Sequence, residues 1–256
     1  MTPFTKDVGQ GGTPALLLHC ALAAHQAILP LAIKLPGLMA TCMDLLGHGA
    51  SPTPDGPNDL EANAAAAATV WQGPGWVIGH SYGAVVALRF AANHPEKVTR
   101  LILIEPVLFA AAGKGTGAAQ FAKDFAPIGA AFDAGDMESA AQHFMGLWGD
   151  GTPWAKVPAP VRAYATARMG FIAESAADLE GDQTGLCAAG ALEGLDCPVT
   201  LIRGSETHPI IADIHDALET RLPQARQHVI KGAGHMAPIS HIDAVTEAIL
   251  SDTSRT

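Results

Sequence analysis

The chain has 256 residues, of which 48% are hydrophobic and only 16% are charged, a composition that excludes a disordered protein. This length suits one α/β domain with a sizeable core and leaves room for an insertion. The formal net charge is -10 and no apolar run approaches the ~18 residues of a membrane span, which argues against nucleic acid or a membrane as a partner.

The amino-terminal residues and the cysteines bear on location. Residues 1–7 contain neither the basic segment nor the apolar segment of a secretory leader. The four cysteines are scattered and form no C-x-x-C pair: Cys20, Cys42, Cys187 and Cys197. Unpaired thiols are typical of a reducing compartment. We therefore expect a cytoplasmic protein.

Short apolar runs that end at polar or glycine-rich turns recur along the chain and predict buried parallel strands. In chain order these runs are 15–18, 39–43, 76–78, 101–104, 199–202 and 228–230. Helix-length segments accompany them at 26–35, from 84 to near 93, at 210–221 and at 242–250. Alternation of strands and helices predicts an α/β fold with a doubly wound, mostly parallel sheet.

A long interval without a strand signal separates Ile104 from Val199, and it is too long for a loop in a compact domain. It contains helix-length pieces at 117–125, 137–147 and 160–174. We expect these pieces to form a helical cap inserted over the carboxyl edge of the sheet. The predicted domains are a core of residues 1–108 and 191–256 and a cap, or lid, of residues 109–190.

The motif G-x-S-x-G occupies residues 79–83, between the apolar run Trp76–Ile78 and a stretch of helix formers. In a nucleophile elbow the serine lies on a sharp strand-to-helix turn, and the flanking glycines prevent side-chain collisions there. The motif is short enough to occur by chance, but a strand before it and a helix after it favour Ser81 as a nucleophile. The alternative is an incidental serine in an ordinary turn.

A serine hydroxyl becomes a good nucleophile only when a neighbouring base takes its proton. Residues 231–236 follow the last strand signal and place His235 among small residues, which leave its imidazole free to reach across the sheet edge. His235 is therefore the predicted base. His241 is the nearest competitor, and we expect it to pack or to face solvent at the start of the final helix.

These segments together resemble the α/β-hydrolase superfamily, and within it the cap-bearing, serine-dependent, esterase-like members. The resemblance rests on the elbow, on His19 before a small-residue loop, and on the sequences at 44–49 and 232–236. It covers residues from about 16 to 250 and matches the cap poorly. In this family the segment like 44–49 shapes a turn, so the resemblance implies a structural role for Asp44.

The acid of the triad departs from the family pattern. The family usually carries an aspartate shortly after the strand that matches 199–202, and here Thr207 stands at that position. Glu206 lies one residue short of it, whereas Glu105 ends the strand after the elbow helix, a position that some members, including certain dehalogenases, use for the acid. We favour Glu105, with Glu206 as the runner-up and a missing or water-replaced acid as the third alternative.

An oxyanion hole needs two backbone N–H groups aimed at the developing negative charge. The amide of Tyr82, directly after the nucleophile, is one predicted donor. The resemblance implies that Ala21, in the loop after the first long strand, is the other. Cys20 replaces the glycine that relatives carry in this loop, and we expect it to be a packed residue rather than a nucleophile.

Large apolar residues of the predicted cap suggest the substrate pocket. We expect Phe109, Trp148 and Trp154 to form its walls, with His19 bracing the neighbouring loop and contributing to the pocket. The basic residues of the cap form no cluster, which disfavours a strongly anionic substrate such as a coenzyme A ester. No H-x-H-x-D-H or H-E-x-x-H pattern occurs, so we expect no metal and no cofactor.

Ser81 favours acyl chemistry, and the resulting prediction is a carboxylesterase-like serine hydrolase that acts on a small, largely apolar substrate through an acyl-enzyme. One alternative is a non-catalytic hydrolase-fold protein that binds a ligand or a partner. Another is a C–C hydrolase or acyltransferase with the same triad. The sequence leaves the oligomeric state open between a monomer and a homodimer.

Overall fold

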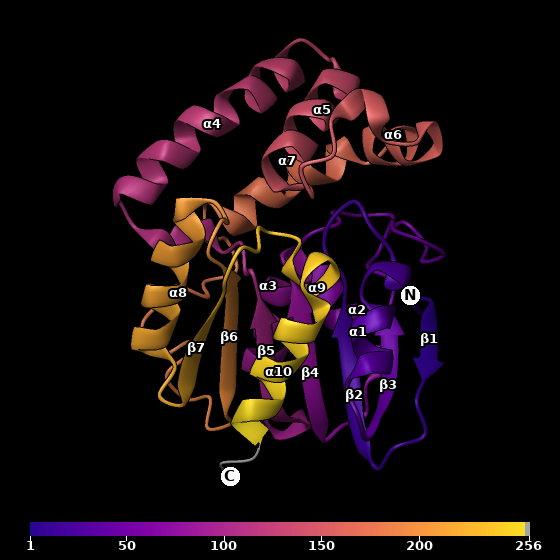
Figure 1. Ribbon diagram of the computed structural model, residues 1–256, viewed down its shortest axis with the longest axis vertical. Coiled ribbons are helices and arrows are strands. Elements are labelled where there is room, and N and C mark those ends of the chain that lie inside the picture. Colours follow the sequence, from indigo (N-terminus) through magenta and orange to yellow (C-terminus); the bar gives the residue numbers. More distant parts are fainter. Residues whose placement is uncertain (254–256) are drawn as a thin grey trace.

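The computed structural model describes residues 1–253 and contains a seven-stranded sheet of order β1-β3-β2-β4-β5-β6-β7 (Figure 1). The strands are β1 (Thr5–Val8), β2 (Thr13–Leu18), β3 (Leu38–Met43), β4 (Gly75–His80), β5 (Val98–Ile104), β6 (Val199–Gly204) and β7 (Ala225–Ile230). Only β1 pairs antiparallel, with β3, and the other neighbours are parallel. The predicted mostly parallel sheet is confirmed.

Helices cover both faces of this sheet, because successive side chains of a buried strand point to opposite faces. Leu16 and Leu18 of β2 pack into one hydrophobic cluster, and Leu17 packs into the other. The first cluster includes residues of α2 (Leu60–Val70), α3 (Tyr82–Asn93) and α8 (Pro209–Arg221). The second includes residues of α1 (Leu29–Lys34), α9 (Ala237–Ser240) and α10 (Ile242–Thr253). The sheet is therefore doubly wound, as predicted.

Four helices fill the long interval between β5 and β6 and lie over one end of the sheet (Figure 1). They are α4 (Thr116–Asp133), α5 (Met137–Trp148), α6 (Ala159–Thr166) and α7 (Met169–Leu179). The single helix expected at 160–174 is in fact two helices, α6 and α7. They separate at Arg168, whose φ of -113° and ψ of 6° leave the helical range. The Arg168 guanidinium donates to the carbonyl of Gly47 and lies over the Tyr164 ring, contacts that a local pattern could not reveal.

The sequence patterns missed β1, α2 and α9. β1 is a short edge strand with polar residues, so it lacks the apolar run of the buried strands. α2 is rich in alanine and has no strong apolar face, but Asp59 caps its first turn by accepting a hydrogen bond from the Ala62 amide. Within residues 1–253, no helix combines the length and the apolar character that a membrane crossing requires.

The strand order changes direction between β2 and β4, which are neighbours in the sheet while β3 lies on the far side of β2. Open α/β sheets commonly bind ligands at such a switch point, outside the carboxyl ends of the strands. The loop after β2 carries Ala21, and Ser81 directly follows β4. The fold therefore brings the predicted oxyanion loop and the predicted nucleophile to the same edge.

Candidate active site

Ser81 lies on the sharp turn between β4 and α3, with a φ of 58° and a ψ of -121°. Its backbone amide donates a 2.8 Å hydrogen bond to the carbonyl of Ile104, which ties the turn to β5. A Cβ atom on Gly79 would overlap the backbone of α3, and one on Gly83 would overlap the carbonyl oxygens that follow β2. The two glycines of the motif are thus required by close backbone approach.

His235 faces the serine from the loop after β7. Its Nε2 atom lies 2.9 Å from the Oγ atom of Ser81, and both side chains are buried. The Nε2 atom of His80 lies 2.9 Å from the backbone carbonyl of His235 and donates to it. Burial lowers the pKa of His80 to about 3, so this ring stays neutral and holds the loop without adding charge. The Trp148 ring packs edge-on against the His235 ring at a centroid distance of 4.8 Å.

Glu105 completes a hydrogen-bonded row. Its Oε2 atom lies 3.0 Å from Nδ1 of His235 and accepts a 2.6 Å hydrogen bond from the Thr207 hydroxyl. Its Oε1 atom accepts a 2.6 Å hydrogen bond from the amide of Gly204. Glu206, the runner-up acid, is exposed and accepts a hydrogen bond from the Ser205 hydroxyl. The structure therefore brings Glu105 to His235, while the threonine at the usual acid position supports the glutamate.

The surroundings of Glu105 favour its ionised form. Burial alone would raise the pKa of this fully buried carboxyl group. Hydrogen bonds from His235, Thr207 and Gly204, together with the attraction of the imidazole, outweigh that effect and lower the pKa below its ordinary value. Glu105 is thus a carboxylate that can orient the His235 imidazole and stabilise its protonated form.

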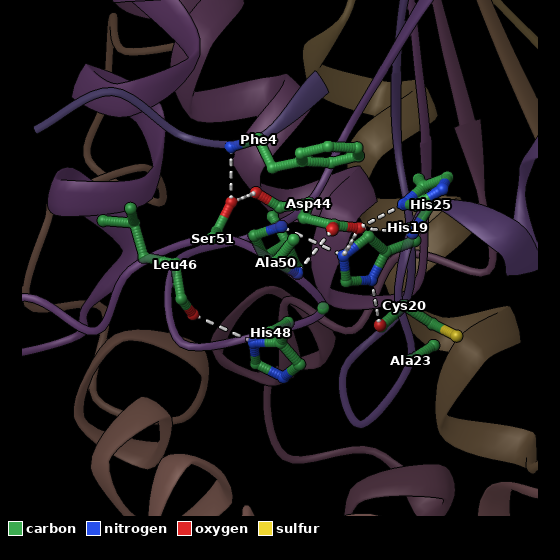
Figure 2. A network of polar contacts seen from close by, with 12 residues as sticks. Phe4, His19, Cys20, Ala23, His25, Asp44, Leu46, His48, Ala50 and Ser51 are labelled. Atoms are coloured by element: carbon green, nitrogen blue, oxygen red, sulfur yellow. Dashed lines mark hydrogen bonds and ion pairs between the residues drawn. The ribbon is translucent and has the colours of Figure 1, made fainter. Parts of the chain in front are cut away.

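Buried histidines hold the loop after β2 (Figure 2). The His19 Nε2 atom accepts a 3.0 Å hydrogen bond from the Leu45 amide, so the His19 proton lies on Nδ1 and is donated to the Cys20 carbonyl at 2.7 Å. The His48 Nε2 atom accepts from the Leu22 amide at 3.2 Å. Burial lowers the pKa of His19 to about 3 and that of His48 to about 4, which keeps both rings neutral.

Asp44 fixes the far end of the same loop (Figure 2). Its Oδ1 atom accepts hydrogen bonds from the backbone amide of His25 at 2.6 Å and from Nδ1 of His25 at 2.9 Å. Its Oδ2 atom accepts one from the amide of Ala50 at 2.8 Å. Asp44 therefore joins the loop at residues 19–25 to the turn at 44–51. This is the structural role that the family resemblance implied.

The predicted oxyanion donors border the serine. Tyr82 is the first residue of α3, so its amide has no acceptor within the helix. Ala21 lines both cavities that contain Ser81. Cys20 is buried, and burial raises the pKa of its thiol to about 12, so the thiol stays protonated and is no nucleophile. Both residues that carry the predicted donors thus border Ser81, and the Cys20 thiol supplies no competing nucleophile.

Two cavities meet at Ser81, and both are also lined by Ala21, Phe144 and Trp148. The inner cavity has a volume of about 40 Å³, is almost wholly apolar and reaches Glu180. Its remaining apolar lining comes from Val107, Phe109, Phe125, Ile172, Ala176 and Leu179. The second cavity has a volume of about 100 Å³ and contains His235. The space at the nucleophile is therefore divided into two compartments.

Two of the four expected pocket residues lie elsewhere. Phe109 and Trp148 line the inner cavity, whereas His19 and Trp154 line neither cavity at Ser81. His19 is 0% exposed because it sits beneath the loop that it braces. Trp154 lies in a surface groove, where the Arg162 guanidinium is 5.9 Å from its ring. Phe144, one helical turn before Trp148, is a lining residue that the i, i+4 spacing on α5 could have indicated.

The arrangement can perform nucleophilic acyl chemistry without a further group. A hydroxyl, an imidazole and a carboxylate stand in one hydrogen-bonded row, which can remove a proton from Ser81 and return it to a leaving group. Among residues 1–253, no group of three or more His, Cys, Asp and Glu side chains is placed to hold a metal ion.

Comparison with known protein families gives a match over most of the chain. Residues 15–248 match the model of the alpha/beta hydrolase family. A pimeloyl-(acyl-carrier protein) methyl ester esterase of Xanthomonas campestris is 30% identical over 249 residues, which are 94% of this chain and 95% of that protein. The lipase LipV of Mycobacterium tuberculosis is 36% identical over 105 residues, and the match spans 39% of this chain and only 40% of the lipase.

Solved structures share the fold at low sequence identity. An esterase from Exiguobacterium antarcticum superposes with a TM-score of 0.71 and 18% identity, over 98% of this chain and 95% of that one. MenH from S. aureus superposes with a TM-score of 0.73 and 17% identity, over 98% of this chain and 97% of that one. At this level of identity, these superpositions show a shared fold of the sheet and its helices.

Proposed function

Because this chain belongs to the alpha/beta hydrolase family, we propose that it is a serine esterase that cleaves a carboxylic ester through an acyl-enzyme intermediate. The observation that carries the proposal is the hydrogen-bonded row of Ser81 Oγ, His235 and Glu105, with separations of 2.9 and 3.0 Å. Such a row supplies a nucleophile, a general base and an orienting acid.

In the proposed reaction, His235 takes the hydroxyl proton while Ser81 Oγ attacks the ester carbonyl carbon. The carbonyl oxygen becomes negative and accepts hydrogen bonds from the amides of Tyr82 and Ala21. His235 then gives its proton to the leaving alcohol, and Ser81 keeps the acyl group. His235 then takes a proton from a water molecule that attacks the acyl carbon, and it gives this proton to Ser81 Oγ as the bond to the acyl group breaks and the acid leaves. Glu105 stabilises the imidazolium at each proton transfer.

The two cavities suggest where each half of the ester lies. His235 lines the second cavity and not the inner one. Since the same imidazole must protonate the leaving oxygen, the alcohol belongs in the second cavity and the acyl group belongs in the inner cavity. The apolar lining of the inner cavity favours a hydrocarbon acyl group. The helices α4–α7 act as the cap that supplies most of these walls.

The comparisons and the charges of the cap narrow the substrate further. A relative that matches along nearly its whole length is described as a methyl ester esterase, and a small alcohol suits a second cavity of about 100 Å³. Arg162 and Arg168 of the cap are engaged with Trp154 and Tyr164, respectively. A neutral ester of a small alcohol is therefore the substrate class that we propose.

The non-catalytic alternative depended on the absence of an acid from residues 204–208. Glu105 fills that role in the hydrogen-bonded row, and Thr207 and Gly204 donate to it, which supports catalysis. A C–C hydrolase or acyltransferase would use the same row. No feature of the cavities favours either over ester hydrolysis.

Hydrolysis of p-nitrophenyl butyrate by the purified protein tests the proposal. We expect steady turnover by the wild-type protein and a loss of at least about 10³-fold in kcat on Ser81→Ala, since the nucleophile and its base act as a unit. Ser139→Ala, at a half-buried serine of α5 that lines neither cavity at Ser81, is the matched control and should keep the wild-type rate. Equal turnover by wild type and Ser81→Ala would overturn the esterase function.

A further inference from the structure

An open groove runs along α4, facing residues 180–187, and has a volume of about 680 Å³. Small residues of α4 line it at one-turn spacing, at Ala118, Ala122 and Ala126, and Gly129 continues the row. Ala122 and Ala126 are exposed. The groove presents more apolar than polar surface, so it is a surface on which a hydrocarbon chain could lie.

This groove adjoins the inner cavity at Ser81. Phe109, Phe125 and Glu180 line both spaces, so these three side chains form the boundary between them. Glu180 follows the last residue of α7 and is itself exposed. The inner cavity and the groove therefore adjoin at these side chains, between the cap helix α4 and the end of α7.

The inner cavity is small compared with the groove. At about 40 Å³ it has room for roughly three water-sized groups, since one such group needs about 10–15 Å³ by the same measure. An acyl group of about four carbons fills it. The remaining carbons of a longer chain must leave past Phe109, Phe125 and Glu180, and the groove lies directly beyond these residues.

We propose that the outer groove on α4 is a second acyl subsite, which binds the distal part of a medium-length to long, uncharged acyl chain whose ester carbonyl lies at Ser81. This inference rests on the proposed esterase function. The groove adjoins the acyl side of the site at three shared residues, whereas the alcohol compartment that contains His235 does not share Glu180 or Phe125.

The charges at the boundary indicate an uncharged chain. Glu180 stands where the chain leaves the inner cavity, and Asp182 lines the groove beyond it. Lys114 lines the same groove as a cation. Two carboxylates near the exit repel a chain that ends in a carboxylate, and an alkyl chain meets no such penalty.

Chain-length dependence tests this subsite. The readout is the ratio of kcat/KM for p-nitrophenyl decanoate, used below its micelle concentration, to kcat/KM for p-nitrophenyl butyrate. We expect the wild-type ratio to exceed one, and Ala122→Trp to lower it about tenfold or more, because each methylene that loses its apolar contact costs roughly fourfold. Ala126→Trp, one turn along the groove, should act in the same direction. This second variant keeps the test decisive if the first fails to fold.

Ala119→Trp is the matched control, because Ala119 is an exposed alanine of the same helix that lines none of these cavities. It should keep the wild-type ratio. A ratio that is the same in all four proteins, or a wild-type ratio below one, would overturn the outer subsite while leaving the esterase function intact. Failure of the wild-type protein to hydrolyse either ester would instead overturn the esterase function on which the subsite rests.

Discussion

Three strained residues mark the candidate site at the level of the single residue. Ser81, Glu105 and Leu22 have φ values of 58°, 53° and 56° although none is a glycine, and within residues 1–253 only Asp182 shares this property. Each such conformation costs on the order of 1–3 kcal/mol and persists only where the surroundings impose it. Here hydrogen bonds impose it: the Ser81 and Glu105 amides donate to neighbouring strands. The strain thus coincides with the proposed nucleophile, the proposed acid and the proposed oxyanion loop.

The choice of acid leads to a prediction for two glutamates. Glu105→Gln keeps the shape of the side chain but removes the charge that stabilises the His235 imidazolium, so we expect kcat for p-nitrophenyl butyrate to fall by about 10²–10⁴-fold. Glu206→Gln is the control, because Glu206 is exposed and contacts Ser205. Its kcat should stay within about twofold of wild type. A large loss in Glu206→Gln with full activity in Glu105→Gln would contradict the assignment.

At the residue scale, the sequence predicted the three residues of the hydrogen-bonded row but not the residues that hydrogen-bond to them. Ser81 and His235 were predicted because short local motifs carry them, and Glu105 because it ends the strand after the elbow helix. The hydrogen bond from Thr207 to Glu105 was not predicted, because these residues are 102 positions apart in the sequence. The position of Thr207, where relatives carry the acid, was the only available signal.

At the level of elements, the loop after β2 depends on the turn at 44–51. Asp44→Asn keeps one acceptor oxygen but replaces the other with a donor, which leaves the part-buried hydrogen bond to the amide of His25 or of Ala50 unmade. We expect a loss of about 1–3 kcal/mol in the free energy of unfolding, measured by urea denaturation. We also expect a lower kcat, because Ala21 belongs to the loop that Asp44 fixes.

Asp55→Asn serves as the control for this loop, since Asp55 is exposed in the segment that follows. Its unfolding free energy should remain within about 0.5 kcal/mol of wild type. If Asp44→Asn proves as stable and as active as Asp55→Asn, the hydrogen bonds of Asp44 do not hold the oxyanion loop.

The elements themselves were predictable where burial dominates the sequence pattern. Strands β2 to β6 read as apolar runs because neighbouring strands and helices bury most of their residues. β7 is the other edge strand, where only Ile230 is buried, and its apolar signal is limited to 228–230. β1 lies at the edge of the sheet, and α2 is mostly alanine, so neither produces such a pattern. The break between α6 and α7 depends on the contacts of Arg168 with Gly47 and Tyr164, which are tertiary.

At the scale of the whole molecule, buried neutral histidines make stability depend on pH. Burial lowers the pKa values of His19 and His80 to about 3 and those of His48 and His215 to about 4, from an ordinary value of 6.5. Between these values the unfolded chain binds more protons than the folded one, so stability rises with pH. The contribution of these histidines to the free energy of unfolding is fully present above pH 6.5 and is lost as the pH falls towards 4.

His215 provides the cleanest test of this effect, because within residues 1–253 neither of its buried ring nitrogens has a hydrogen-bond partner. His215→Leu removes one buried titrating group. We expect the difference in the free energy of unfolding between this variant and wild type to shift in favour of the variant as the pH falls, by up to about 3 kcal/mol near pH 4. His143→Gln, at an exposed histidine, should follow the wild-type pH dependence. Parallel curves for wild type and His215→Leu would contradict this origin of acid sensitivity.

The shape of the substrate site belongs to the whole molecule and could not be obtained from the sequence. The cap was expected as a helical segment, but which of its aromatic residues face Ser81 depends on how α4, α5 and α7 pack over the sheet. Phe109 and Trp148 face the inner cavity, whereas Trp154 faces a separate surface groove. The sequence identifies these side chains as large and apolar. Only the packing of the helices determines which of them line the cavity and which lie at the surface.

Labelling with a fluorophosphonate tests the central claim most directly, because this reagent phosphonylates a serine only where a base activates it. We expect the native protein to take up one phosphonyl group, and peptide mass spectrometry to locate it on Ser81. His235→Gln should abolish the labelling and Glu105→Gln should slow it. A native protein that remains unlabelled, or that carries the group on a different serine, would contradict a nucleophile at Ser81 activated by His235 and Glu105.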